Sequence, residues 1–369
     1  LTSGACNIAM GENALGASTD GNDNIAIGKS ALAVSDGVGD SNIAIGNIAM
    51  GGADVSGHNN IAMGDNSMDA LTSGLYNIGF GQSALGAATT GCDNIAIGRL
   101  ALSGAVACGG AGQAENNIAI GKDSLDGLTT GSNNIGIGNH AGGGTVTGNS
   151  NLAIGYLAVD ALTSGACNVG LGHAALGAAT DNCGNVAIGQ NALAVSDADA
   201  DFNVAIGYYA MGGADVSSTG NVAIGTQAMD ALTTGAENVA IGGNSFGAAT
   251  IGCKNVAIGM NAMVGVTTGQ ADGNVAIGSD AMKGAAGTTG NYNVAISDAA
   301  LCAVTTGSDN IAIGRAAGDS VTTQSCVINI GFGVDSTTAS TTCIGGTCVM
   351  ATQFTATSDC RSKKDIKDL

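Results

Sequence analysis

Apolar and polar positions follow one short period that repeats along almost the whole chain. A five-residue phrase, Asn-Ile/Val-Ala-Ile-Gly with small variations, recurs nineteen times. Its leading asparagines are Asn7, Asn24, Asn42, Asn60, Asn77, Asn94, Asn117, Asn134, Asn151, Asn168, Asn185, Asn203, Asn221, Asn238, Asn255, Asn274, Asn293, Asn310 and Asn329. Most intervals are 17 or 18 residues, a few are 19 and one is 23. A repeat this short cannot bury its own apolar side chains, so the pattern predicts a solenoid stabilised by stacking.

Each repeat has the same internal order: an apolar strand phrase, a small-residue corner, a second apolar pair and a Thr-Thr-Gly turn, as in 221–237. Side chains of a strand point alternately to its two faces, so Val222 and Ile224 share one face and Ala223 lies on the other. Both faces are apolar, as in strands buried on both sides. We expect the branched aliphatics to fill the coil interior and the alanines to let another backbone layer approach. Glycine takes the place of this alanine at Gly79, Gly136, Gly170 and Gly331.

A helical interpretation is disfavoured, because the recurring glycines would cost about 1 kcal/mol each in helix interiors. The 63 glycines instead mark corners. Apolar residues make up 45% of the 369 residues but aromatic ones only 3%, which suits thin layers rather than one globular core. Proline is absent, as expected where backbone N–H groups pair with the next coil. The sequence therefore predicts an all-β, parallel β-solenoid or β-roll of about 19 coils of 17–19 residues, on the order of 90 Å long.

The anchor asparagines have two interpretations. Asparagines at one place in successive coils form a hydrogen-bonded amide ladder inside a turn, or they form a row of ligand contacts. We favour the structural ladder, represented by Asn24, Asn94, Asn185, Asn221 and Asn255.

A longer duplication lies above the coil repeat. Residues 1–74 and 162–235 align without gaps at an offset of 161, which spans nine coils. Growth in whole coils is what a filament tolerates.

Charge limits the partners. The net charge is −19, and basic residues are sparse until the last nine positions, so nucleic acid is not an expected partner. Acidity of this kind keeps an exposed rod soluble. The aspartates do not recur in a calcium-binding pattern. No stretch is long and apolar enough to span a membrane and no signal peptide opens the chain; because Leu1 lies inside a turn phrase, we expect the natural start to lie upstream.

The eleven cysteines show no disulfide framework by spacing. Several occupy turn positions just before an anchor asparagine, where we expect small hydrophobic thiols: Cys6, Cys92, Cys167, Cys183 and Cys253. Cys167 and Cys183 are close enough in phase to approach each other, and Cys343 and Cys348 are a candidate local pair. The histidines His58, His140 and His173 differ in phase, so we predict no metal site, no cofactor and no hydrolytic triad. Paired carboxylates and aromatic platforms do not recur at one phase, which disfavours an enzyme acting on glycans.

The periodicity breaks after Asn329, which divides the chain into a repeat array at 1–333, a capping or transition region at 334–357 and a third segment at 358–369. The third segment reads Ser-Asp-Cys-Arg-Ser-Lys-Lys-Asp-Ile from Ser358.

These two parts carry two resemblances. The coils resemble the N-x-A-I-G-x-x-A-L-x-x-x-T-T-G repeats of phage tail-fibre-like proteins and, more loosely, the head repeats of trimeric autotransporter adhesins, which are left-handed parallel β-rolls assembled as trimers. The resemblance implies a homotrimeric rod. The last segment is similar to the S-D-x-R-L-K-x-x-I opening of the endosialidase-type intramolecular chaperone domain, whose remainder would lie beyond Leu369. It implies Ser358 as nucleophile and Lys363 as its base, with self-cleavage before Ser358; a buried lysine can activate a serine in this way. The pattern departs at Ser362, where leucine is usual.

Three function classes follow. The first is a structural and adhesive fibre of a virion, which attaches to a host cell-surface receptor or glycan and is matured by self-cleavage, with no other enzymatic activity. The second is a bacterial surface adhesin or extracellular filament subunit, for which a membrane-anchor domain would be the distinguishing feature. The third is an ice-binding solenoid, suggested by the threonine rows and disfavoured because adjacent threonines point to opposite faces.

Overall fold

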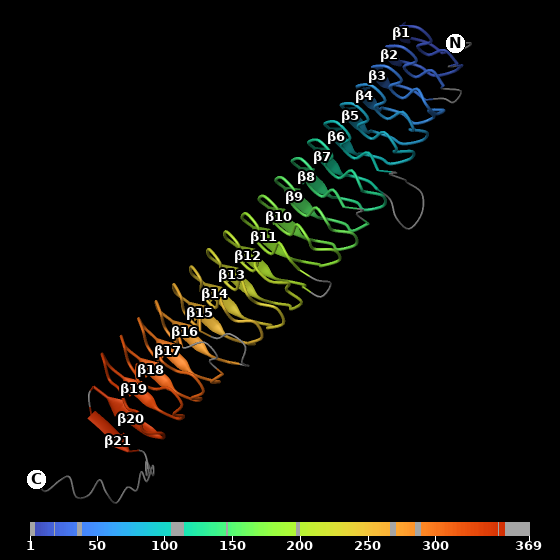
Figure 1. The fold of residues 1–369 in the computed structure, drawn as a ribbon. Helices are drawn as coiled ribbons and strands as arrows, with labels where there is room; N and C mark the ends of the chain where they lie inside the picture. Colours follow the sequence, from blue (N-terminus) through green and yellow to red (C-terminus); the bar gives the residue numbers. More distant parts are fainter. Residues whose placement is uncertain are drawn as a thin grey trace, which may run out of the picture.

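The computed structural model is a long, straight rod with residues 4–17 at one end and residues 347–350 at the other (Figure 1). It describes residues 4–17, 19–34, 39–104, 114–144, 147–196, 200–265, 271–284, 289–345 and 347–350. The strands are β1 (Ile8–Met10), β2 (Ile25–Ile27), β3 (Ile43–Ile45), β4 (Ile61–Met63), β5 (Ile78–Phe80), β6 (Ile95–Ile97), β7 (Ile118–Ile120), β8 (Ile135–Ile137), β9 (Leu152–Ile154), β10 (Val169–Leu171), β11 (Val186–Ile188), β12 (Val204–Ile206), β13 (Val222–Ile224), β14 (Val239–Ile241), β15 (Val256–Ile258), β16 (Val275–Ile277), β17 (Val294–Ile296), β18 (Ile311–Ile313), β19 (Ile328–Ile330), β20 (Thr341–Ile344) and β21 (Thr347–Met350).

Consecutive strands from β1 to β20 pair in parallel, each with the strand of the next coil. The register is constant, so Ala205 of β12 lies beside Ala223 of β13 and the flanking residues pair in the same way. The described residues contain no helix. The predicted fold class, an all-β parallel solenoid with one short strand per repeat, is confirmed.

The interior of each coil is lined by the small face of the strand, not by the branched face. Ala223 is fully buried, whereas Val222 and Ile224 are only half-buried on the outside. The expectation that valine and isoleucine fill the interior was therefore wrong. The reason is width: the second apolar pair already fills the coil, with Met229 and Leu232 fully buried opposite the strand. In β1 to β18 this central strand position accordingly holds only alanine or glycine.

Close packing of this kind is visible where glycine replaces the strand alanine. A methyl group added at Gly79 would lie 2.8 Å from Ser67 Oγ and 3.0 Å from Met68 Cε. The glycine that ends the phrase has another role. Gly225 has φ 136°, and a Cβ there would lie 2.6 Å from the carbonyl oxygen of Gly242 in the next coil. This corner therefore requires glycine both for its backbone angle and for the stacking distance.

The last parallel coils correct one assignment of the repeat. Asn329 is the central residue of β19, where it pairs with Ala312 and Cys343 and occupies the interior position. Val327 holds the anchor position, and its N–H donates to Asn310 Oδ1 at 2.9 Å. Gly331 is consequently a corner glycine with φ 129° and not a substitute for the strand alanine. The shift arose because the phrase Val-Ile-Asn-Ile-Gly contains an asparagine two places late.

Beyond β19 the pattern changes within the predicted transition region. β20 still stacks in parallel on β19, but β21 returns antiparallel to β20. Cys343 is disulfide-bonded, and its register partner in β21 is Cys348. The hydroxyl oxygens of Ser336 and Thr341 lie 2.6 Å apart, where the asparagine ladder has ended. This end of the rod is closed by hydroxyl groups and a hairpin.

Candidate functional site

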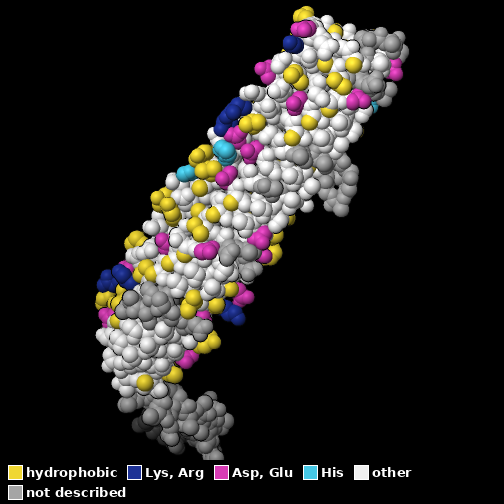
Figure 2. All heavy atoms as spheres, turned by 45° about the vertical axis from the view of Figure 1, so that its right-hand side comes forward, with side chains coloured by type: hydrophobic (Ala, Val, Ile, Leu, Met, Phe, Trp, Pro, Cys, Tyr) yellow, Lys and Arg dark blue, Asp and Glu magenta, His cyan; other side chains and the backbone are white. Residues whose placement is uncertain are grey.

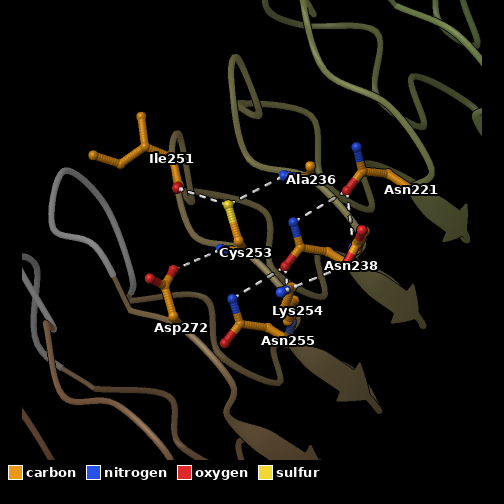
Figure 3. A network of polar contacts seen from close by, with 9 residues as sticks. Asn221, Ala236, Asn238, Ile251, Cys253, Lys254, Asn255 and Asp272 are labelled. Carbon is orange, nitrogen blue, oxygen red and sulfur yellow. Dashed lines mark hydrogen bonds and ion pairs between the residues drawn. The ribbon is translucent and has the colours of Figure 1, made fainter.

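The asparagine ladder runs inside the rod and ties each coil to its neighbours. Asn221 is fully buried, and its Oδ1 accepts the backbone N–H of Asn238 at 3.0 Å (Figure 3). Its Nδ2 donates to the carbonyl of Gly235 at 3.0 Å. One amide thus closes its own coil and binds the next. The same pattern includes every residue named for the ladder: Asn24, Asn94, Asn185, Asn221 and Asn255. Because these amide groups are saturated by the protein, they are not available to a ligand.

A second, interrupted ladder runs along the turn, two residues before the anchor. In many coils the side chain at this position accepts the backbone N–H of its counterpart in the preceding coil. Figure 3 shows two rungs: Asp272 Oδ1 accepts from Cys253 N at 2.8 Å, and Cys253 Sγ accepts from Ala236 N at 3.4 Å. Cys183 occupies the same position and accepts from Ala166 N at 3.4 Å. These cysteines are hydrogen-bond acceptors in a turn and not simply small hydrophobes.

The threonine row is structural as well. In several coils the first threonine of the turn donates its hydroxyl to the carbonyl of its counterpart in the next coil, at 2.9 Å for Thr72 to Thr89 and 2.8 Å for Thr233 to Thr250. The hydrogens of these hydroxyl groups are therefore engaged within the rod and are not available for donation to ordered water. This arrangement argues against an ice-binding row at these positions.

The outward side of the parallel sheet is a continuous apolar surface, which we call the aliphatic face and define as the first and third residues of β1 to β19. Every one of these positions holds valine, isoleucine, leucine, methionine or phenylalanine, without a polar side chain among them. The third residues are the more exposed: Ile97 is 42% exposed and Leu171 40%. With about 4.8 Å per coil and about 10 Å of width, the face covers roughly 900 Å². Soluble monomers rarely expose an apolar patch of more than about 600 Å².

Next to this face, beyond the corner glycine, runs a line of long and varied side chains. We call it the corner ridge and define it as the fifth residue after each anchor position. It holds four of the six basic residues outside 358–369, namely Lys29, Arg99, Lys122 and Arg315. It also holds rings: Tyr156 and His173 stack at 5.4 Å, and the Arg315 guanidinium lies 4.7 Å from the Phe332 ring centre. Figure 2 shows basic and hydrophobic side chains gathered along one long edge of the rod.

The corner ridge contradicts the expectation that aromatic side chains share no phase. Tyr156, His173 and Tyr208 all follow their anchors by five residues. An alignment of the repeats in columns reveals this shared position of the rings, which no single motif marks.

Acidic groups converge at one place, in the turns that follow β7 and β9. Burial raises the pKa of Asp126 and of Asp160, and the neighbouring charge of Asp123 raises that of Asp126 further. A Cβ added at Gly143, in the coil between them, would lie 2.7 Å from Asp160 Oδ1 and 3.3 Å from Asp126 Oδ1. His140 lies 3.4 Å from Asp123. This acidic cluster is suited to hold protons.

Four further predictions concern a metal site, a membrane span, a cysteine pair and the cleavage dyad. Within the ranges the structure describes, no group of three or more histidine, cysteine or carboxylate side chains could hold a metal ion, and no helix there is long and apolar enough to cross a membrane. Cys167 and Cys183 are free thiols and not a pair. Ser358 and Lys363, the proposed cleavage dyad, lie outside the described residues.

Comparisons with known proteins add no assignment. No protein-family model, no curated protein and no solved structure matches this chain. Its function must therefore be inferred from the rod and its surfaces.

Proposed function

We propose that this protein is a structural and adhesive fibre, similar to phage tail fibres, which works as a homotrimeric rod. The observation that supports the proposal is the aliphatic face, which runs along β1 to β19 and stays partly exposed with only the described residues of one chain around it. Its estimated area of roughly 900 Å² exceeds the ~800 Å² that each partner contributes to a standard protein interface.

The partner that fits this face best is another copy of the chain. The side chains on it repeat once per coil, and a second rod with the same rise meets them in the same register over the full length. The face itself carries no charge, so copies can meet there although each chain has a net charge of −19. The acidic groups remain outside, where they keep assembled rods apart.

Three copies around one axis, rather than two, follow from the resemblance to chaperone-assembled fibres. In that arrangement all rods are parallel and their C-terminal ends lie together. The segment at 358–369 is then the start of a chaperone that aligns three chains and is removed by Ser358 and Lys363.

Assembly is tested by size-exclusion chromatography with multi-angle light scattering at micromolar concentration. We expect a particle of three times the chain mass of 35.2 kDa. A stable monomer would contradict the proposal.

Maturation is tested with a chain extended through its natural downstream sequence. We expect a released fragment whose first residue, by mass spectrometry, is Ser358, and we expect Ser358→Ala and Lys363→Ala each to block the release without preventing assembly. Cleavage that survives both substitutions would remove the chaperone assignment and leave the rod.

A further inference from the structure

One stretch of the corner ridge differs from the rest. Between β9 and β12 its four consecutive positions are Tyr156, His173, Gln190 and Tyr208, with Tyr209 beside the last. All four ridge side chains are exposed; Tyr156 is 52% and Tyr208 48% exposed. Elsewhere on the ridge, rings occur only at Phe332.

The spacing of these side chains is fixed by the coils beneath them. Backbone bonds join the rungs: Ala174 N donates to the Tyr156 carbonyl at 2.9 Å, Asn191 N to the His173 carbonyl at 2.9 Å and Tyr209 N to the Gln190 carbonyl at 3.0 Å. The rise between rungs is therefore the coil rise of about 4.8 Å.

The rings form two ordered pairs on this line. The Tyr156 and His173 rings are close to parallel, with an interplanar angle of 21° and centres 5.4 Å apart. The Tyr208 and Tyr209 rings meet edge to face, with centres 4.7 Å apart and an angle of 70°. Between the pairs lies the amide of Gln190, which can both donate and accept hydrogen bonds. Apolar ring surface and polar groups thus alternate along one line.

This alternation suits a ligand whose units are flat, apolar on the face and polar at the edge. A pyranose ring has this form, because its C–H groups lie on the faces and its hydroxyl groups at the rim, and it is about as long as one coil rise. The bases of nucleic acids also stack on aromatic rings. However, no lysine or arginine occurs between Lys122 and Lys254, whereas Asp160, Asp181 and Asp201 lie in this stretch. Electrostatic repulsion therefore disfavours nucleic acids and acidic glycans here.

We propose that Tyr156, His173, Gln190 and Tyr208, with Tyr209, form a binding platform for a linear, neutral oligosaccharide that lies along the rod axis. The inference rests on the proposed function in so far as it gives the fibre's attachment role a place on the rod and a class of ligand. The outward edges and the unstacked faces of the tyrosine and histidine rings contact the C–H faces of the sugar, and Gln190 with the phenol groups forms hydrogen bonds to its hydroxyls.

The duplicated half of the chain supports this assignment. At the offset of 161, the counterparts of His173, Gln190 and Tyr208 are Glu12, Lys29 and Asn47, and that of Tyr209 is Ile48. Glu12 and Lys29 form an exposed ion pair at 3.6 Å. The same coils fold with either set, so the rings are not needed by the scaffold.

Cellohexaose, maltohexaose and the hexamer of N-acetylglucosamine are suitable probes, titrated by calorimetry and by tyrosine fluorescence. The chain has no tryptophan, and three of its five tyrosines belong to the platform. We expect at least one hexamer to bind and to change the emission. Replacement of Tyr208→Asn with Tyr209→Ile, the residues of the other half, should weaken binding about tenfold or more, as should Tyr156→Ala with His173→Glu.

The matched control is Tyr76→Ala with Tyr292→Ala, two exposed tyrosines away from the ridge, which should leave affinity unchanged. No binding of any hexamer at millimolar concentration overturns the proposal, as does binding that persists in both platform variants. Stronger binding of a single-stranded oligothymidine than of every hexamer overturns the choice of a neutral sugar. Light scattering on the same samples separates the two ideas: a monomer that binds sugar contradicts only the trimer, and a trimer that does not bind contradicts only the platform.

Discussion

The two duplicated regions, 1–74 and 162–235, share a framework and differ on their surface. Inside the coils the residues are retained: Met50 and its counterpart Met211 are both fully buried and both have positive φ, 49° and 51°. On the corner ridge all four paired positions differ. The interior of a thin coil admits only residues of similar size at each place, such as Ser67 and its counterpart Ala228, whereas the corner beyond the glycine accepts almost any side chain. The array is therefore a repeated scaffold that carries a variable edge.

The largest expected effect is the loss of stability when the buried asparagine ladder is interrupted, and this loss should be equal in the two duplicated regions. Asn24 and Asn185 are counterparts, and each Oδ1 accepts the next anchor N–H at 2.8 Å. Replacing either by alanine leaves buried groups unpaired, at about 1–3 kcal/mol for each group. Urea unfolding followed by circular dichroism should show similar losses for Asn24→Ala and Asn185→Ala.

Their ridge neighbours Lys29→Ala and Gln190→Ala serve as controls and should change the free energy of unfolding little. Equal losses for ladder and ridge variants would show that the ladder contributes nothing specific.

The second largest effect compares a regular coil with the coil of β19. Asn329 is 1% exposed and neither of its amide atoms has a hydrogen-bond partner among the described residues. Asn329→Ala restores the usual interior residue and should stabilise the rod by about 1–3 kcal/mol. The reverse change in the neighbouring coil, Ala312→Asn, should destabilise the rod, which a lower melting temperature in thermal unfolding would show. A loss of stability in Asn329→Ala would mean that the amide has a partner in solution.

The smallest expected effect is on the pH dependence of stability, and it should have the same size in both duplicated regions. Asp69 and Asp230 are counterparts, and burial raises the pKa of each above the ordinary value of 3.8. Because the folded pKa is raised, their contribution to stability is full below about pH 3.8 and is lost as the pH rises through the folded pKa. Asp69→Asn and Asp230→Asn should each raise the melting temperature slightly at pH 7 and leave it unchanged at pH 3. A lower melting temperature at pH 7 in both variants would contradict the sign.

The fold could be predicted from the sequence because one period fixes strand, corner and stacking direction together. The inward face could not, since alternation defines two apolar faces without saying which one a narrow coil admits. Met229 and Leu232 decide this, and they come from the opposite side of the coil. The prediction that Asn329 is an anchor was wrong because the corner Gly331, and not the asparagine, marks the position of each residue within this repeat.

Site prediction was less complete for a related reason. The amide ladder was predictable, since one polar residue at one phase must be paired when it is buried. The hydrogen bond to the Cys253 sulfur was not, because nothing in the sequence distinguishes an acceptor from an apolar thiol. The rings of Tyr156 and His173 meet only because their rungs are adjacent.

The aliphatic face is tested most directly by sedimentation equilibrium of the wild type and of a variant charged at matched rungs in both duplicated regions, Met63→Glu with Ile224→Glu. Both residues lie on this face, and Met63 is 37% exposed in the single chain, so the change leaves the coil interior intact. If copies meet through this face, the wild type sediments as a trimer and the variant as a folded monomer with an unchanged circular dichroism spectrum. A variant that remains trimeric would contradict assembly through this face.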